Sequence, residues 1–141
     1  MIVDANLLLY ARNADDVRGE RAAEWLEGVL NGPVRVGLPW QTLTAFLRIA
    51  TNARVFPDPL DPGDAWQQVE AWLAAPAAWV PVPTARHAEV LGRLVTDLRV
   101  TAGLVSDAHL AALALEHGVG IWSTDRDFTR FPGLRWADPL A

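Results

Sequence analysis

The sequence contains no cysteine and no lysine, and it has no long uninterrupted hydrophobic run. The absence of cysteine excludes a disulfide framework, a thiolate metal site and a cysteine nucleophile. No apolar stretch approaches the roughly 20 residues that a membrane-spanning helix requires. The first four residues, Met-Ile-Val-Asp, lack the basic region and apolar core of a signal peptide. We therefore expect a cytoplasmic protein with no membrane partner.

Positive charge is also scarce. All 12 cationic residues are arginines, they stand against 17 acidic residues, and the formal net charge is −5. A protein that coats nucleic acid without specificity normally carries net positive charge. Any RNA-binding role must therefore depend on local geometry. Acids gathered around a bound cation can form a local RNA-binding site, because the cation reverses the local field. The planar guanidinium of arginine is also well suited to binding phosphate.

Several catalytic motifs are missing as well. The chain has no Gly-x-Ser-x-Gly sequence, no Gly-x-Gly-x-x-Gly sequence and no P-loop lysine, which argues against serine hydrolase chemistry and nucleotide binding. The three histidines, His87, His109 and His117, lack a paired spacing such as His-Glu-x-x-His. His109 lies close to Asp107, and we interpret it as structural or as a support for a neighbouring ligand.

The chain that remains suits one compact domain over residues 1–141, because 51% of its residues are hydrophobic and no repeat, low-complexity run or linker divides it. Short apolar runs predict strands near residues 1–5, 34–38, 79–82, 120–123 and 134–136. Helical spacing of apolar residues predicts helices over residues 7–10, 15–30, 39–52, 61–75, 84–98 and 106–117, with Thr84 and Ser106 as expected N-caps of the last two. This alternation predicts an α/β fold of three layers, a short parallel sheet of about four to five strands with helices on both faces.

Four aspartates fall at the carboxyl edge of this predicted sheet. Asp4 closes the first strand, Asp107 opens the most apolar helix, and Asp125 and Asp127 follow the fourth strand. Active sites of parallel sheets collect at this edge. Carboxylates that converge there repel one another unless a divalent cation neutralises them, and hard oxygen ligands favour Mg²⁺ or Mn²⁺. The positions therefore predict an acidic metal site.

Each of these aspartates also has a purely structural interpretation. Asp4 could cap the helix that follows it, and Asp107 could complement a helix dipole. Asp125 and Asp127 could simply form a turn, since one Asp-x-Asp sequence is a weak signal. Their joint placement on one edge of the sheet favours the site over four separate structural roles.

Four segments resemble VapC-like PIN-domain toxins of bacterial toxin–antitoxin pairs. They are residues 1–6, 40–56, 105–118 and 122–139, and they include the stretches Asp-Ala-His-Leu-Ala-Ala and Thr-Asp-Arg-Asp-Phe. With the predicted helix after residue 61, the likeness covers nearly the whole chain. It implies a PIN-like fold, a Mg²⁺ or Mn²⁺ site, cleavage of RNA, and inhibition by a cognate VapB-like antitoxin. It also implies a homodimer, which the apolar helices at 15–30 and 61–75 favour because a small monomer does not easily cover them.

Carried over to this sequence, the resemblance makes Asp4, Asp107 and Asp125 metal ligands and adds Asp127 as a fourth catalytic acid. A second set of polar residues is expected to bind substrate or orient the attacking water: Asn6, Thr124 and Arg126. Capping and solvated turns would explain that second set equally well. Arg48 either contacts RNA or braces the fold.

The sequence departs from the family at its second acid. Ala45 stands where the family has a glutamate before the Phe-Leu-Arg segment, and no acid occurs between Glu27 and Asp58. A shift of one helical turn therefore cannot supply the missing carboxylate. A first metal can remain, because Mg²⁺ keeps several waters and often needs only one or two protein carboxylates.

Three functions follow from these residues. The first is a metal-dependent endoribonuclease toxin. The second is a PIN-fold module that binds RNA or a partner and is catalytically weak because of Ala45. The third, a phosphatase of the haloacid-dehalogenase type, ranks low because it requires Asp-x-Asp after the first strand and Asn6 occupies the second position.

Overall fold

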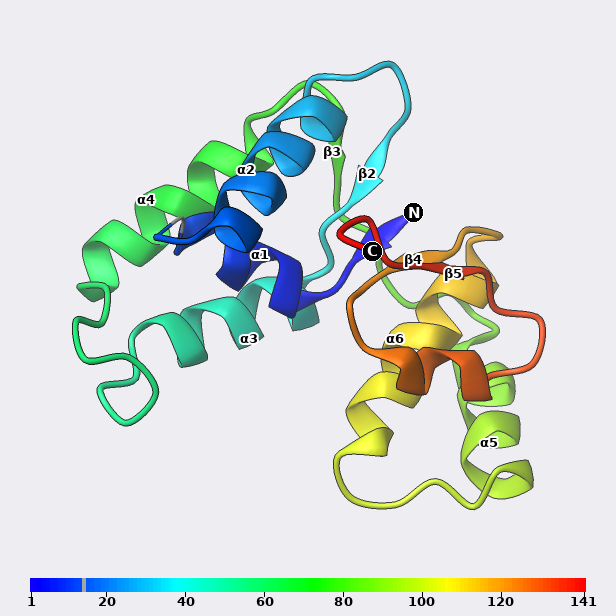
Figure 1. Ribbon diagram of the computed structural model, residues 1–141. Coiled ribbons are helices and arrows are strands. Elements are labelled where there is room, and N and C mark those ends of the chain that lie inside the picture. Colours follow the sequence, from blue (N-terminus) through cyan, green and yellow to red (C-terminus); the bar gives the residue numbers. More distant parts are fainter. Residues whose placement is uncertain (14) are drawn as a thin grey trace.

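A five-stranded parallel sheet runs through the centre of the protein in the computed structural model, which describes residues 1–13 and 15–141 (Figure 1). Within those ranges the strands lie in the order β3-β2-β1-β4-β5. They are β1 (Ile2–Val3), β2 (Val36–Gly37), β3 (Ala78–Trp79), β4 (Ile121–Trp122) and β5 (Trp136–Ala137). Each strand is shorter than its apolar run predicts. The regular hydrogen-bonded ladder spans only two residues in each strand before the chain continues as a helix or a loop.

Helices cover both faces of the sheet. In the described part of the chain they are α1 (Ala5–Arg12), α2 (Val17–Leu30), α3 (Trp40–Ala50), α4 (Pro62–Leu73), α5 (His87–Asp97), α6 (Leu104–Glu116) and the 3₁₀ helix η1 (Arg126–Arg130). Figure 1 shows α1 to α4 on one side of the sheet and α5, α6 and η1 on the other. The predicted α/β architecture is confirmed. None of the described helices has the length and apolar character needed to cross a bilayer.

The central strand divides the interior into two cores. Successive side chains of a strand point to opposite faces, so Val3 packs among α1 to α4 and Ile2 packs against α5, α6 and η1. Both side chains are completely buried. On the α6 side, small alanines at 108, 111, 112 and 114 are buried against the sheet. The site must therefore form at an edge of the sheet, since both faces are filled.

Helix ends follow from local side chains. Asp16 begins α2 by accepting a hydrogen bond from Gly19 N at 2.7 Å, and Asp61 begins α4 by accepting one from Gly63 N at 2.9 Å. Gly118 ends α6, as predicted, with a φ of 66° that favours glycine. These signals set the start of α2, the start of α4 and the end of α6.

The predicted N-cap of α6 is wrong. The helix begins at Leu104, which leaves Ser106 inside its first turn. The reason is a tight turn just before it: the amides of Leu104 and Val105 donate to the carbonyls of Thr101 and Ala102 at 3.2 and 3.1 Å. Asp107 consequently lies in the first helical turn rather than directly after a cap.

Thr84 is likewise not the N-cap of α5, which begins at His87. Its hydroxyl donates instead to Glu116 Oε1 at 2.7 Å, while its carbonyl accepts from His87 N at 3.1 Å. The backbone amide and the hydroxyl of Thr84 both donate to the buried carboxylate of Glu116 at the end of α6. The contact ties the start of α5 to the end of α6.

Candidate functional site

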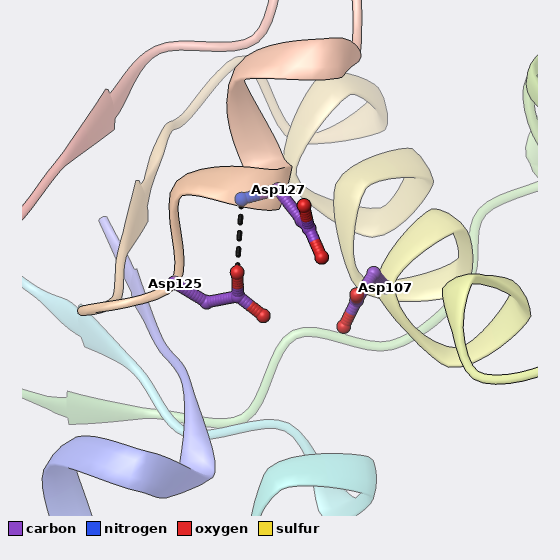
Figure 2. A group of neighbouring side chains, drawn as sticks. All are labelled: Asp107, Asp125 and Asp127. Atoms are coloured by element: carbon purple, nitrogen blue, oxygen red, sulfur yellow. Dashed lines mark hydrogen bonds between the residues drawn. The ribbon is translucent and has the colours of Figure 1, made fainter.

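Three aspartates converge where α6 meets the turn after β4. Asp107, in the first turn of α6, projects toward Asp125 and Asp127, which lie at the start of η1 (Figure 2). One carboxylate oxygen from each residue lies within 4.8 Å of the others. Asp125 Oδ1 also accepts a hydrogen bond from Asp127 N at 2.9 Å, which fixes the turn. The turn-forming interpretation and the site interpretation therefore both apply to this pair.

Asp4 lies at the same edge of the sheet but outside that group of three. It caps α1, because Oδ1 accepts from Ala5 N at 2.8 Å, and its Oδ2 accepts from the hydroxyl of Ser123 at 2.7 Å. The sequence predicted Asp4, Asp107 and Asp125 as ligands, whereas the grouped oxygens belong to Asp107, Asp125 and Asp127. Asp4 is held beside this group by two hydrogen bonds.

Burial and neighbouring carboxylates raise the pKa values of two of these acids, Asp107 and Asp4. Burial, followed by the charges of Asp125, Asp4 and Asp127, raises the pKa of Asp107 to about 6. Burial also raises the pKa of Asp4, and the charge of Asp125 adds to this, although hydrogen bonds from Ser123 and Ala5 oppose it. Such shifts reflect like charges held together away from water. A divalent cation at this place would relieve the repulsion.

Ser123 connects the acids on β1 and the β4 turn. It is completely buried, it donates to Asp4 Oδ2, and it accepts from Asn6 Nδ2 at 3.1 Å and from Asp125 N at 3.0 Å. From the sequence, Ser123 and Thr124 could both orient the attacking water or a phosphate oxygen, and only Thr124 was kept among the predicted site residues, although it makes no side-chain hydrogen bond within the described residues. The available signal was a hydroxyl at the carboxyl end of a buried strand.

Two amide oxygens turned to the same region have no hydrogen-bond donor. Asn6 Oδ1 and Gln41 Oε1 are buried and lack a partner among the described residues. Both residues line the same cleft as Asp4 and Asp107. The other end of the Gln41 amide is fixed, since Nε2 donates to Ser106 O at 2.8 Å. Neutral acceptor oxygens beside carboxylates suit the water shell of a hydrated Mg²⁺ or Mn²⁺, so the residues present fit such an ion.

The cleft itself has two unlike walls. It is open, with a volume of about 620 Å³. Asp4 and Asp107 form what we call its acidic wall, and residues of α3, Ala45 and Arg48 among them, form what we call its α3 wall. The position where the family places its second acid therefore does face the cleft, but in this chain it carries a methyl group.

Two further residues considered from the sequence are Arg126 and His109. Arg126 is exposed on η1. The ring of His109 contacts that of His87, with Nδ1 and Nε2 3.0 Å apart, and the imidazole of His87 in turn meets the carboxylate of Glu116. Burial and the neighbouring His87 lower the pKa of His109. Its contacts agree with the structural role predicted for it.

Comparison with known proteins gives full-length relatives. The family model described as PIN domain matches residues 1–134. The protein named Ribonuclease VapC37 of Mycobacterium tuberculosis is 51% identical over 140 residues, which cover 99% of this chain and 97% of that protein. Ribonuclease VapC33 of the same species is 40% identical over 140 residues, covering 99% and 98%.

Solved structures share the fold at low identity. VapBC2 from Rickettsia felis, bound to a DNA fragment from its promoter, superposes with a TM-score of 0.68 at 14% identity and 96% coverage of both chains. VapBC-1 from nontypeable Haemophilus influenzae gives the same TM-score and identity over 99% of this chain and 98% of that one. With a matching fold, a full-length family match and closely similar relatives, the chain belongs to the PIN-domain family and is one of its VapC-like members.

Proposed function

We propose that this chain is a Mg²⁺- or Mn²⁺-dependent endoribonuclease, acting in the cytoplasm as the toxic member of a toxin–antitoxin pair. One observation carries the proposal. The carboxylates of Asp107, Asp125 and Asp127 converge beside a cleft in a chain 51% identical to a protein named as a ribonuclease. The function requires RNA as substrate and hydrolysis of its phosphodiester bonds.

The side chains divide the work of the site. Asp107, Asp125 and Asp127 would hold the ion, and Asp4 would complete the negative field from its place between Ser123 and Ala5. Such an ion, when bound, acidifies a water and stabilises charge on a phosphate.

Neighbouring groups would position the water and the substrate. The free Oδ1 of Asn6 and Oε1 of Gln41 can accept hydrogen bonds from ordered water and so orient it. Thr124 and Arg126 stand beside the acids in the chain, where a hydroxyl and a guanidinium can contact a phosphate. These two assignments follow from position alone.

The alternative is a PIN-fold module that binds RNA or a partner and cleaves poorly. The observation that favours it is Ala45, because α3 presents no carboxylate to the cleft. A cleavage assay on structured RNA separates the two functions. We expect cleavage with Mn²⁺ or Mg²⁺ that stops in EDTA. RNA that stays intact while it binds the protein would support the binding module instead.

We also propose a VapB-like antitoxin as the partner. The solved proteins that share this fold include complexes titled VapBC. Co-expression with the product of a short neighbouring reading frame should abolish cleavage and form a stable complex. Cleavage that continues in the presence of every such product would contradict this partner.

A homodimer is the third part of the proposal. Several large apolar side chains are exposed, among them Trp40 at 45%, Trp66 at 44% and Val17 at 72%. Exposed apolar surface of this kind often marks an interface. Light scattering at micromolar concentration should give twice the chain mass of 15.4 kDa. A clean monomer mass would rule the dimer out.

A further inference from the structure

The α3 wall of the cleft differs chemically from the acidic wall. Gln41, Ala45 and Arg48 follow one another at intervals of four and three residues, which sets them on one face of the helix. All three line the cleft together with Asp4 and Asp107. The helix, Trp40–Ala50, contains no acidic residue. This wall therefore has no anionic ligand with which to hold a cation of its own.

Arg48 is the one cationic side chain among the described residues that line this cleft. It is exposed, and within residues 1–13 and 15–141 its guanidinium takes part in no ion pair. A guanidinium has five N–H donors and no acceptor. Its planar fork matches two oxygens of a phosphate better than an ammonium group does. Arg48 is thus a free anion-binding group at the mouth of an acidic site.

An RNA strand needs such a group in order to enter. The whole chain carries a formal charge of −5. The acidic wall carries Asp4 and Asp107, with Asp125 close enough to raise the pKa of both and Asp127 close enough to raise that of Asp107. A polyanion approaching this field is repelled over about one Debye length. A metal bound to the acids would neutralise part of that charge. The metal would bring no positive charge to the α3 wall, because Ala45 offers no ligand that could hold it there.

We propose that Arg48 forms a phosphate-binding subsite for RNA on the α3 wall, where it binds the non-bridging oxygens of a phosphodiester. The guanidinium then supplies the positive charge that this wall cannot obtain from a bound cation. Arg48 would hold the RNA strand in the cleft, while the aspartates would hold the metal ion. The inference rests on the proposed function, since it takes RNA as the polymer that enters the cleft.

Binding without metal isolates this contribution. The probe is a short single-stranded RNA of mixed sequence with a 5′ fluorescein, and its anisotropy is followed in EDTA over a series of NaCl concentrations beginning at low salt. EDTA prevents metal-dependent cleavage and removes the contribution of the ion to binding. The slope of log K against log salt is negative. Loss of one phosphate contact reduces its magnitude by about 0.7 for a single strand.

Arg48→Met is the test variant, and Arg48→Lys is its conservative partner. For Arg48→Met we expect the RNA affinity at low salt to fall about tenfold and the magnitude of the salt slope to decrease by about 0.7. For Lys we expect the slope to be retained and the affinity to be intermediate, because the charge remains and the fork is lost. Melting temperatures should match the wild type, since Arg48 is exposed and forms no ion pair with any residue that the structure describes.

Arg35→Met provides a matched control. Arg35 is also exposed, but it precedes β2 and therefore lies at the amino edge of the sheet, away from the acids. Its guanidinium sits 3.7 Å from the ring centroid of Trp79. The variant removes the same charge from the same chain, so its RNA affinity should stay close to that of the wild type.

Each other outcome overturns the subsite. Unchanged affinity and slope in Arg48→Met, or an equal loss in Arg35→Met, would mean that Arg48 binds no particular phosphate. A fall in melting temperature specific to Arg48→Met would assign it a structural role. Absence of wild-type binding in EDTA would also count against the subsite. The proposed function is judged separately by cleavage of the same RNA with Mn²⁺, so cleavage with unchanged Arg48→Met binding would remove the subsite alone.

Discussion

The two walls of the cleft are built in opposite ways. The acidic wall takes Asp4 and Asp107 from segments that lie far apart in the sequence, and the parallel sheet brings them, together with Asp125, to one edge. The α3 wall comes from one helix, whose face presents an amide, a methyl group and a guanidinium. The acidic wall is suited to a cation and the α3 wall to an anion. If the proposed function holds, metal binding and substrate binding fall to different walls of the cleft.

Backbone geometry explains why the acidic wall is so ordered. Asp4 and Asp125 are N-caps, and Asp107 lies in the first turn of α6. Helix N-termini favour negative charge and offer free amides, so each carboxylate is both structurally useful and correctly aimed. The cap of α3, Pro39, makes no side-chain hydrogen bond, and this helix is tied to its surroundings further along, where Gln41 donates to Ser106 O and Thr42 to Val3 O.

Asp107→Asn should have the largest effect on this comparison, because it removes a charge from the centre of the acidic wall. We expect Mn²⁺ affinity and metal-dependent cleavage to fall by about 100-fold or more, while the far-ultraviolet circular dichroism stays unchanged. Calorimetric titration and a cleavage assay measure both effects. Asp97→Asn, an exposed residue at the end of α5, is the control. An active Asp107→Asn protein with wild-type metal affinity would remove this residue from the site.

Ala45→Glu should make the two walls more alike, with the next largest effect. A carboxylate at the cleft would tighten Mn²⁺ binding by about tenfold, which corresponds to one added charge in a medium of intermediate dielectric. It would also pair with Arg48 three residues on and weaken RNA binding in EDTA. Calorimetry and anisotropy report the two changes separately.

Ala71→Glu, on the exposed side of α4, adds the same charge elsewhere and should change neither quantity. Unchanged Mn²⁺ affinity in Ala45→Glu would mean that position 45 cannot reach the ion. It would then follow that the three grouped aspartates already complete the protein's share of the coordination.

The contrast between the walls also marks how far the sequence alone could go. Spacing was sufficient for the parallel sheet and for the placement of Asp4, Asp107 and Asp125 at one edge, because strand–helix alternation determines which loops meet. It could not identify Ser123 as the residue that bonds Asp4. Nor could it find the buried oxygen of Gln41. Both depend on side-chain directions and distances between segments, which no periodic pattern records.

Helix starts were the other weak point of the sequence reading. Ser106 and Thr84 carry the right chemistry for N-caps, yet neither caps its helix. Thr84 instead donates to Glu116, 32 residues away. A local propensity of about 1 kcal/mol is easily outweighed by a buried carboxylate that requires donors.

The pH dependence of the acidic wall gives a third, smaller effect. The pKa of Asp107 is raised to about 6 in the folded protein, so the folded state binds a proton more tightly than the unfolded state. Stability from this proton is present below the unfolded pKa and is lost as pH rises through about 6. At pH 7 the metal-free Asp107→Asn protein should therefore be the more stable by about 1–2 kcal/mol, allowing for solvent screening.

Urea unfolding in EDTA at several pH values measures that difference. The advantage of Asp107→Asn should shrink as pH falls from 7 toward 4, where the wild-type carboxyl is protonated as well. Mn²⁺ affinity of the wild type should weaken over the same interval, because protons compete for the ligand. A stability difference that does not vary with pH would show that the raised pKa of Asp107 is not its source.

Glu116→Gln should have the smallest effect on the cleft, because it lies outside both walls. The carboxylate is inaccessible to solvent and accepts hydrogen bonds from Thr84 N at 2.9 Å, from the Thr84 hydroxyl and from His87. Burial alone would raise the pKa of Glu116, but the hydrogen bonds outweigh it and lower the pKa. The stabilisation is thus present above the unfolded pKa of Glu116 and is lost as pH falls through its folded pKa.

At pH 7 we expect Glu116→Gln to lose about 1–3 kcal/mol of unfolding free energy, whereas Glu70→Gln, exposed on α4, should lose almost none. Mn²⁺ affinity and RNA binding should match the wild type in both variants. A marked loss of Mn²⁺ affinity in Glu116→Gln alone would instead link this cluster to the acidic wall, through His109 on the same helix as Asp107.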